Sequence, residues 1–283
     1  MKICNTIDEI RSHIKIIKKA DKSIGFVPTM GYLHDGHLSL VKKAKEENDI
    51  VVVSIFVNPT QFGAGEDLES YPRDLDRDFQ LLKSQEVDFV FVPSVDEMYN
   101  KAYKTYVDVE GQITKKLCGS SRKGHFRGVT TVVSKLFNIA APDRAYFGQK
   151  DAQQVAVIEQ MVRDLNFDID IISCPIVREK DGLALSSRNA YLNSKEREDA
   201  AILSKSLFLA EKMIENGVKE AKKIKKFIID KINTVDYAKI DYVEIVDAKT
   251  LENVNILQGD ILIAVAVKIG KPRLIDNIKV EVK

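Results

Sequence analysis

Three of the four histidines lie in glycine-containing segments with polar neighbours, and two of them, His34 and His37, are three residues apart. They follow an apolar run at 24–28 and precede a helical pattern at 38–47, which predicts a strand, a turn and a helix in that order. The free N–H groups at such a helix N-terminus attract anions. Imidazoles there would donate hydrogen bonds to phosphate oxygens and stabilise a phosphorus-centred transition state.

Zinc binding is an alternative use of this histidine pair. The segment His34-Asp35-Gly36-His37 lacks the HExxH pattern, and no third ligand is spaced nearby, so the sequence disfavours a metal site. A pair that only packs in the core is a further alternative. Gly31 and Gly36 favour the anion-binding interpretation, because glycine allows close backbone approach or positive φ.

Two further polar segments follow predicted strands. Asn58 and Gln61 come after the apolar run 50–57, and their neutral amides suit the recognition of hydroxyl and carboxylate groups. Lys150 and Asp151 come after a short apolar run at 145–147; the lysine would bind a phosphate and the aspartate would cap the next helix. Either segment taken alone is also typical of an ordinary turn.

Two loops could hold phosphate groups. One contains Ser186, Ser187 and Arg188 in a row, and arginine offers a fork of donors that matches phosphate. The other, at 121–128, places cations between glycines. Taken alone, both are typical of solvated turns. The chain has no GxGxxG, GxxxxGK[ST] or GxSxG pattern, which argues against dinucleotide oxidoreductases, P-loop enzymes and α/β-hydrolases.

These segments need a scaffold that brings strand ends together, and the first two thirds of the chain predict one. Apolar runs alternate with helical patterns, as in right-handed crossovers of a parallel sheet, where ligands bind outside the carboxyl ends of the strands. We therefore expect the segments after Val27, Val57 and Phe147 to meet in one cleft. The predicted strands are 24–28, 50–57, 87–93, 145–147 and 167–174, and the helices are 38–47, 75–83, 130–139 and 152–165.

The last third has a different pattern. Asn193 and Glu196 have capping-box spacing and predict one long helix to about Asn216, followed by a second helix at 219–231. Strands at 242–247, 261–268 and 278–282 would form a small antiparallel sheet. The sequence thus predicts an α/β protein: a Rossmann-like doubly wound parallel sheet in domain 1–175 and a smaller C-terminal α+β domain, 176–283.

Bulk composition excludes several classes of protein. The net charge of +1 gives no electrostatic reason to expect nucleic-acid binding, and three scattered cysteines do not form a disulfide framework. The N-terminus lacks the uninterrupted apolar core of a signal peptide, and the longest apolar runs are too short to span a bilayer. We therefore expect a cytoplasmic protein that binds neither nucleic acid nor membrane.

The whole set of motifs resembles one family. The strand–turn–helix element with H-D-G-H is similar to the HIGH-type signature of the nucleotidylyltransferase superfamily. In chain order, P-T-M-G-Y-L-H-D-G-H, F-V-N-P-T-Q-F, Y-P-R, G-H-F-R-G-V, F-G-Q-K-D-A-Q-Q, D-G-L-A-L-S-S-R-N and P-R-L-I-D-N resemble the pantothenate synthetase (pantoate–β-alanine ligase) family. The resemblance runs from about Val27 to Asn277.

This resemblance implies a reaction in two steps. Pantoate, in its (R) form, and Mg-ATP give pantoyl adenylate and pyrophosphate, and β-alanine then attacks the acyl carbon and releases AMP. It implies Mg²⁺ held mainly by the ATP phosphates, a C-terminal domain that closes over ATP, and a homodimer that associates through the first domain. Pantothenate is a precursor of coenzyme A.

The resemblance also implies roles for particular residues. His37 would donate a proton in adenylation with His34 beside it, and Lys150 and Arg188 would act on the phosphates. Gln61 and Gln154 would bind pantoate, with Gln61 also near β-alanine. ATP would contact Met30, Gly31, Tyr32, Leu33, His34, Asp35, Gly36, His37, Gly148, Gln149, Lys150, Asp151, Val177, Leu185, Ser186, Ser187 and Arg188.

Some questions stay open at this stage. Gln149 and Cys118 stand where some relatives carry Glu, which leaves the charge around the metal and phosphates undecided. An adenylate must be shielded from water, so a mobile flap is expected, and the polar, glycine-containing segment 62–69 is the candidate. A different nucleotidylyltransferase is one alternative, which would share His34 and His37 but not the pair Gln61 and Gln154. An RNA-binding or synthetase-derived module is another, and the net charge of +1 and the lack of an anticodon-binding extension weigh against it.

Overall fold

The computed structural model describes residues 1–283, which divide into two compact units. The first unit comprises 1–109, 122–149 and 157–175, and the second comprises 110–121, 150–156 and 176–283. Two short segments from the first two thirds of the chain, one of which begins with Lys150, thus pack with the C-terminal third.

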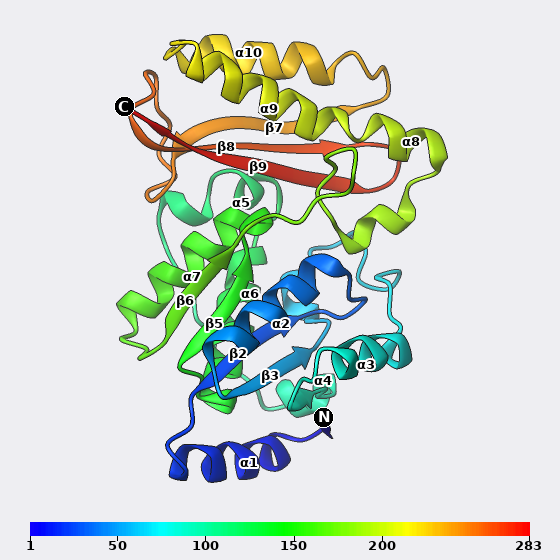
Figure 1. Ribbon diagram of the computed structural model, residues 1–283, viewed down its shortest axis with the longest axis vertical. Helices are drawn as coiled ribbons and strands as arrows, with labels where there is room; N and C mark the ends of the chain where they lie inside the picture. The colour runs from blue at the N-terminus through cyan, green and yellow to red at the C-terminus, as the bar shows by residue number, and fades with distance from the viewer. The chain divides into compact units, whose positions relative to one another are not determined.

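The first unit contains a six-stranded parallel sheet in the order β1-β4-β3-β2-β5-β6 (Figure 1). Its strands are β1 (Lys2–Cys4), β2 (Ile24–Thr29), β3 (Ile50–Ile55), β4 (Phe89–Phe91), β5 (Arg144–Gly148) and β6 (Asp170–Cys174). The helices that belong to it are α1 (Ile7–Lys19), α2 (Asp35–Glu47), α3 (Leu75–Ser84), α4 (Val95–Met98), α6 (His125–Ala140) and most of α7 (Ala152–Asp164). The predicted parallel, Rossmann-like sheet is confirmed.

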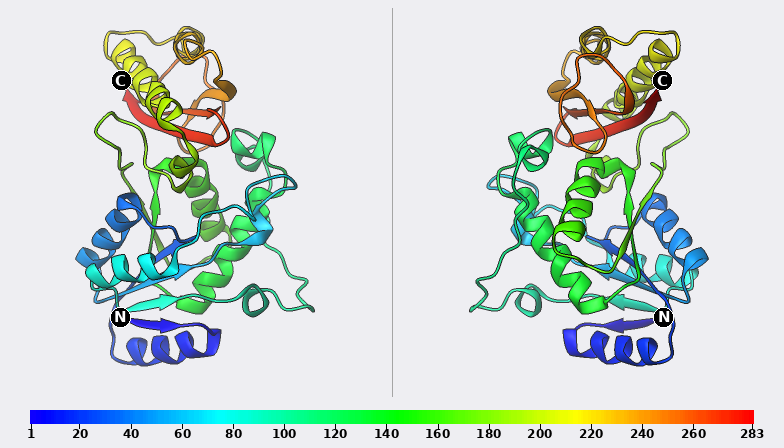
Figure 2. Two further views of the ribbon diagram at one scale, coloured as in Figure 1. Left: turned by 90° about the vertical axis from the view of Figure 1, so that its right-hand side faces the viewer. Right: turned by 90° about the vertical axis from the view of Figure 1, so that its left-hand side faces the viewer.

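Helices cover both faces of this sheet, with α2 and α3 on one face and α6 on the other (Figure 2). The strand residues on the α2 face, such as Val27, Val51 and Val53, are fully buried against Leu82 of α3 and Val41 of α2. Covering on two faces explains why the strands consist of continuous β-branched and aromatic residues rather than an alternation of polar and apolar ones.

The order in which strands are added to the sheet reverses at β2, which lies between β3 and β5. The sequence runs outward from β2 through β3 to β4, and then returns to the other side of β2 for β5. In an open α/β sheet, the carboxyl ends of the strands at such a switch point form the usual binding crevice. The segments after β2, β3 and β5 therefore begin at one edge of the sheet, and the cleft that they were expected to share stays a prediction.

The second unit contains a three-stranded antiparallel sheet, β7-β8-β9, made of β7 (Lys239–Asp247), β8 (Gly259–Lys268) and β9 (Arg273–Val282). Helices α9 (Ile202–Glu215) and α10 (Ala221–Ile232) pack on one face of it, through residues that include Leu207, Ile224 and Ile228. The other face packs a smaller cluster with Leu117 and Ala156 from the two short segments. The small antiparallel sheet was predicted correctly.

One element prediction was wrong. The single long helix expected from Asn193 to Asn216 is divided into α8 (Ser194–Asp199) and α9. The amide of Leu203 donates to the carbonyl of Ala200, three residues back, which tightens the chain at this point. Ala200 and Ala201 are almost fully buried at this turn, and neither residue type is a helix breaker, so sequence pattern alone could not reveal the division.

Strand β1, helix α1 and the start of helix α6 differ from what the sequence pattern predicted. Strand β1 and helix α1, with a capping box at Thr6 and Glu9, were not predicted. Helix α6 begins at His125, five residues before the predicted start, because Gly124 in a left-handed conformation (φ +80°) leads directly into it. The second half of the segment 121–128 is therefore the start of a helix and not a free turn.

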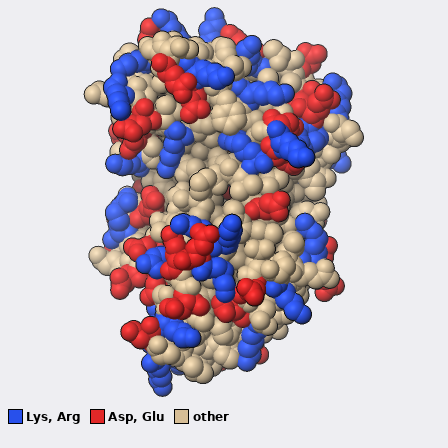
Figure 3. All heavy atoms as spheres, in the orientation of Figure 1, with Lys and Arg blue, Asp and Glu red and all other residues tan.

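No helix in the structure is at once long enough and apolar enough to cross a membrane. On the face drawn in Figure 3, lysine and arginine side chains alternate with aspartate and glutamate over both units, in keeping with the net charge of +1 (Figure 3).

Candidate active site

The histidine pair lies at the N-terminus of α2, directly after the central strand β2. His34 is the N-cap, and its Nδ1 accepts a hydrogen bond from the amide of Gly36 at 3.2 Å. The Nδ1 of His37 accepts from the amide of His34 at 3.3 Å, and the two rings lie 4.1 Å apart. Because both Nδ1 atoms are acceptors, the neutral rings carry their protons at Nε2.

The turn before these histidines is held by a buried aspartate that the sequence analysis missed. The carboxylate of Asp78, on α3, accepts the amides of Tyr32 (2.8 Å) and Leu33 (2.7 Å) and is 1% exposed. Burial raises the pKa of Asp78, and the two amide hydrogen bonds oppose that rise. Its position 45 residues after Leu33 gave no local signal that would have linked it to the turn.

Gly31 is required by both conformation and space. Its φ is +78°, and a Cβ there would lie 2.9 Å from the Ile55 side chain and 3.0 Å from the Asp78 carboxylate. Glycine at this point lets the chain turn sharply from β2 into α2.

The structure brings Gln61 to the same turn. Its Nε2 lies 3.1 Å from the sulfur of Met30, and its Oε1 accepts from Nδ2 of Asn58 at 3.1 Å. Asn58 is 1% exposed, and its Oδ1 accepts from the Tyr99 hydroxyl, whose pKa burial raises to about 12. Two segments that are distant in sequence, the H-D-G-H turn and the N-P-T-Q turn, therefore meet at the carboxyl ends of β2 and β3.

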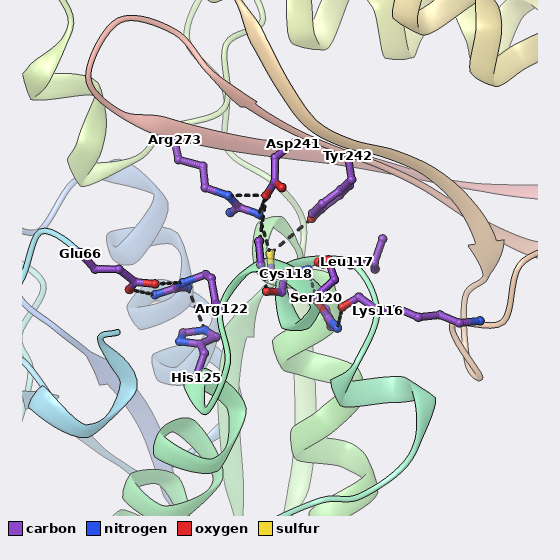
Figure 4. A network of polar contacts seen from close by, with 12 residues as sticks. Glu66, Lys116, Leu117, Cys118, Ser120, Arg122, His125, Asp241, Tyr242 and Arg273 are labelled. Carbon is purple, nitrogen blue, oxygen red and sulfur yellow. Dashed lines mark hydrogen bonds and ion pairs between the residues drawn. The ribbon is translucent and has the colours of Figure 1, made fainter. Parts of the chain in front are cut away.

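A second network holds the backbone of Gln61, and Figure 4 shows its ionic part (Figure 4). The Nδ1 of His125 lies 2.8 Å from the Gln61 carbonyl, and Nη1 of Arg122 lies 3.0 Å from the Nε2 of His125. Arg122 also forms a two-pronged ion pair with Glu66, at 2.8 and 2.6 Å. Glu66 lies in the segment 62–69, so the predicted flap is tied to α6 in this structure.

Gly148 and Gln149, two residues that the resemblance assigns to ATP, lie at the end of β5 and directly after it. Gly148 ends the strand, and a Cβ there would meet nothing within 4 Å. The side-chain oxygen of Gln149 accepts from the Ser173 hydroxyl at 2.8 Å, which ties it to β6. Where some relatives carry Glu, Gln149 thus forms an uncharged hydrogen bond that joins the turn after β5 to β6.

The second unit carries the other predicted residues on two segments. Lys150, in a short 3₁₀ turn (Gln149–Asp151), has its Nζ 3.1 Å from the Asp151 carboxylate. Gln154, in the first turns of α7, is partly buried. Its neighbour Gln153 is buried, and its side-chain amide donates to the carbonyls of Ile113 and Lys116, which fixes α7 to the segment 110–121.

The second of these segments is a short hairpin followed by a 3₁₀ helix (Ser187–Tyr191). Arg178 and Ala184 pair in an antiparallel bridge, and the amide of Leu185 donates to the carbonyl of Val177 at 3.0 Å. The Ser186 hydroxyl caps the 3₁₀ helix by accepting the amide of Arg188 at 3.3 Å. Val177 and Leu185, eight residues apart in the chain, are therefore direct neighbours.

A buried polar group in β9 supports both segments. Asp276 is 1% exposed at its side chain and pairs with Arg178 through two hydrogen bonds, at 2.6 and 2.9 Å. Burial raises the pKa of Asp276, and the charges of Arg178 and Lys150 oppose that rise. Asn277, the next residue, donates from Nδ2 to the carbonyl of Lys150 at 2.9 Å.

Cys118, the other departure, lies in a separate cluster of the second unit (Figure 4). Its sulfur is 3.4 Å from the Tyr242 hydroxyl and 3.5 Å from Nη2 of Arg273, which also pairs with Asp241 at 2.7 Å. Burial raises the pKa of Tyr242 well above its ordinary value. Neither replacement of Glu removes a residue that the resemblance assigned to substrate.

The comparison with known proteins decides the family. A profile described as Pantoate-beta-alanine ligase matches residues 2–279. The chain belongs to the pantoate–β-alanine ligase family. It is 61% identical to the pantothenate synthetase of Acetivibrio thermocellus over 282 residues, which cover 100% of both chains. It is 58% identical to that of Thermotoga petrophila over 277 residues, 98% of this chain and 99% of the relative.

Solved structures of pantoate–β-alanine ligases agree with this assignment. A crystal structure of pantothenate synthetase from Thermus thermophilus has a TM-score of 0.95 at 43% identity, covering 99% of this chain and 100% of the other. The pantoate–β-alanine ligase of Francisella tularensis, crystallised with β,γ-ATP and β-alanine, has a TM-score of 0.80 at 39% identity and covers 98% and 97%. The chain is thus an enzyme that ligates pantoate to β-alanine.

Proposed function

We propose that the chain makes pantothenate in two chemical steps within this site. In the first, a carboxylate oxygen of (R)-pantoate attacks the α-phosphorus of ATP, a P–O bond forms, and the bond to pyrophosphate breaks. In the second, the amine of β-alanine attacks the acyl carbon, the bond to AMP breaks, and the amine loses a proton. The Francisella relative, which was crystallised with an ATP analogue and β-alanine, supports the choice of co-substrates.

One observation carries this proposal: His34 and His37 form the N-terminus of α2 beside the switch point of the sheet. Their Nδ1 atoms are engaged by backbone amides, so each neutral ring carries an Nε2–H that can donate. We assign to His37 a hydrogen bond, donated from its Nε2–H to a phosphate oxygen on which charge grows during adenylation, and to His34 a supporting hydrogen bond. The amides of the helix terminus add partial positive charge at the same place.

The amide side chains supply substrate recognition. Gln61 is held by Met30, Asn58 and His125, so its amide is pre-oriented and loses little entropy on binding. We assign Gln61 to pantoate and β-alanine and Gln154 to pantoate. A neutral amide can pair with hydroxyl groups without adding charge near the reacting carboxylate, and no covalent enzyme nucleophile is needed because AMP is the leaving group.

The remaining residues of the set would bind ATP. We assign the backbone of 30–37, Gly148, Gln149, Val177 and Leu185 to the nucleotide and Lys150, Ser186, Ser187 and Arg188 to its phosphates. Lysine and arginine complement phosphate charge, and hydroxyls add short hydrogen bonds.

Mg²⁺ would enter with the nucleotide. No group of three or more His, Cys, Asp or Glu side chains is arranged to hold an ion, and Asp151 is a partly exposed carboxylate beside Lys150. This donor set fits an ion bound chiefly by phosphate oxygens, with Asp151 as the protein ligand. Bound there, Mg²⁺ would neutralise phosphate charge.

The family resemblance also supports a homodimer in the cytoplasm. The three cysteines are all buried and free, which fits a reducing compartment. Sedimentation of the purified chain at several concentrations tests the dimer, and a concentration-independent monomer would contradict it.

AMP release tests the proposed reaction. The chain is given Mg-ATP with pantoate alone, β-alanine alone, or both, and AMP is followed over many turnovers. Sustained release should require both acids, because the adenylate stays bound until the amine attacks it. Equal sustained release with pantoate alone, or none with both, would contradict the proposal.

A further inference from the structure

Two consecutive residues of β9, Asp276 and Asn277, have no assigned role in the reaction, yet they are among the most buried polar residues of the chain, at 2% and 3% exposed. Burial of polar side chains is costly unless each finds partners. Both have them, and the partners lie in the two second-unit segments to which we assigned ATP phosphates.

Asp276 holds the first of these segments. Its carboxylate takes both terminal nitrogens of Arg178, which also donates to the carbonyl of Gly182 at 3.0 Å and stacks 5.0 Å from the Phe208 ring centre. Arg178 therefore joins the first strand and the turn of the hairpin to β9. The hairpin leads directly into Ser186, Ser187 and Arg188, so its position sets theirs.

Asn277 holds the second segment. Its Nδ2 donates to the backbone carbonyl of Lys150, and its own amide donates to the Asp276 carboxylate at 2.7 Å. A bond to the Lys150 backbone fixes where the lysine side chain begins but leaves its ammonium group available to a ligand.

Strand geometry explains how two adjacent residues can contact both the hairpin and Lys150. Successive side chains of a strand point to opposite faces. Asp276 is paired with Val265, whose side chain belongs to the helix-covered core, and Asn277 with Ala264, whose side chain belongs to the cluster on the other face. The rigid centre of the antiparallel sheet thus reaches one phosphate-binding segment on each face.

We infer that Asp276 and Asn277 are positioning residues that hold the 177–188 segment and Lys150 at a fixed spacing for the phosphates of ATP. The inference rests on the proposed function, because the phosphate roles of those two segments belong to it. The residues themselves do not touch substrate.

The test measures binding of a non-hydrolysable ATP analogue with Mg²⁺ to the full-length chain, together with the KM values for ATP and β-alanine. Asn277→Ala removes the hydrogen bond to the Lys150 carbonyl. Arg178→Lys keeps the positive charge but cannot form the two parallel hydrogen bonds to Asp276. Each should weaken analogue binding and raise the KM for ATP about fivefold or more, the size expected for a lost hydrogen bond, and leave the KM for β-alanine within about twofold.

Two further variants separate positioning from stability. Arg178→Met with Asp276→Leu removes both buried charges together, and replacement of a buried ion pair by apolar residues is often neutral or stabilising. This double variant should unfold like the wild type yet still bind the analogue about fivefold more weakly. Lys279→Ala, an exposed position on the same strand, is the matched control and should change neither quantity.

Wild-type analogue binding by Asn277→Ala, or by the double variant, would overturn the positioning role. The proposed function fails separately. A wild-type chain that binds the analogue but makes no AMP with pantoate and β-alanine would contradict the reaction and leave the positioning result standing. A wild-type chain that binds no analogue would overturn both.

Discussion

At the scale of single residues, the histidine pair stabilises the start of α2 in addition to the chemical role that we propose for it. The Nδ1 atoms of His34 and His37 satisfy amides at the start of α2, which a helix N-terminus leaves without partners. The same bonds set the tautomer and so place the ring proton at Nε2. Structure and chemistry therefore use different nitrogens of the same ring, and substitution can separate them.

His37→Asn is expected to separate the two roles. The Asn side-chain oxygen can take the place of Nδ1 as acceptor for the His34 amide, but it supplies nothing at the Nε2 position. The rate of adenylate formation should fall about 100-fold or more, the usual contribution of a hydrogen-bond donor placed where charge develops in the transition state. The unfolding midpoint should stay near that of the wild type.

Single-turnover release of pyrophosphate and thermal unfolding together check this prediction. His37→Ala is the companion variant, which should lose the same rate and also about 0.5–1.5 kcal/mol of stability, because the His34 amide loses its hydrogen-bond acceptor. An Asn variant with near-wild-type pyrophosphate release would remove His37 from the mechanism.

At the scale of elements, the site depends on how closely α6 approaches the short 3₁₀ turn η1 (Pro59–Gln61). Gly128 of α6 lies against this turn, and a Cβ there would sit 2.4 Å from the Thr60 carbonyl oxygen. The carbonyl of Gly128 also accepts from Asn58, which in turn holds Gln61. Helix α6 therefore supports the Gln61 amide, which we propose binds pantoate.

Gly128→Ala should consequently disturb both stability and substrate binding. The methyl group must displace backbone, so we expect a loss of about 1–3 kcal/mol in the free energy of unfolding. The KM for pantoate should rise, since η1 carries Gln61. Urea unfolding and steady-state kinetics measure the two effects. Gly63→Ala, where the nearest atom to a Cβ is 3.6 Å away, is the control and should be tolerated. Unchanged values for Gly128→Ala would show that α6 can move away without cost.

The tie between Glu66 and Arg122 predicts a pH dependence for the segment 62–69. Burial raises the pKa of Glu66, but the hydrogen bonds and charge of Arg122 outweigh it, so the pKa is lowered overall. A carboxylate with a lowered pKa stabilises the fold above its unfolded pKa of about 4.3, and this contribution is lost as pH falls through the folded value.

Glu66→Gln should therefore be less stable than the wild type at pH 7, by about 1 kcal/mol after allowance for partial exposure. The difference should shrink as pH falls below about 4. Urea unfolding at pH 7 and at about pH 3.5 compares the two chains, with Glu69→Gln in the same segment as an exposed control. A difference that is constant with pH would mean that the ion pair does not stabilise the segment.

At the scale of the whole molecule, the residues that we propose for catalysis and substrate binding belong to two cores. The first unit presents His34, His37 and Gln61 at strand ends of a parallel sheet, and the second presents Lys150 and the Ser186–Arg188 loop around an antiparallel sheet. Neither core includes a group of three metal-ligating side chains. Folding and metal dependence should therefore be separable properties.

Chelation of divalent ions should stop the reaction without unfolding the chain. With excess EDTA, AMP release from ATP, pantoate and β-alanine should fall to background, while the thermal unfolding midpoint should stay within about 2 °C, less than a 1 kcal/mol loss would produce. Added Mg²⁺ should restore activity. A large fall in the midpoint would reveal a structural metal held by the protein itself.

The sequence by itself determined the features that depend on local pattern. Apolar runs and helical spacing predicted the parallel sheet, the start of α2 near Asp35 and the small antiparallel sheet, because burial on one or two faces leaves a periodic trace in the chain. The motifs indicated the family because each is a continuous segment, so its residues and their spacing can be recognised without the fold.

Only the tertiary structure decided which distant residues support those motifs. Asp78 of α3 accepts a hydrogen bond from the turn before α2. The missing side chain of Gly128 lets α6 pack closely against η1. Asp276 pairs with Arg178, which is 98 residues away in the chain. It also decided that Lys150 packs with the C-terminal third and that Ala200 and Ala201 interrupt a helix. Such contacts join residues that share no local spacing, since packing selects them by shape and charge in three dimensions.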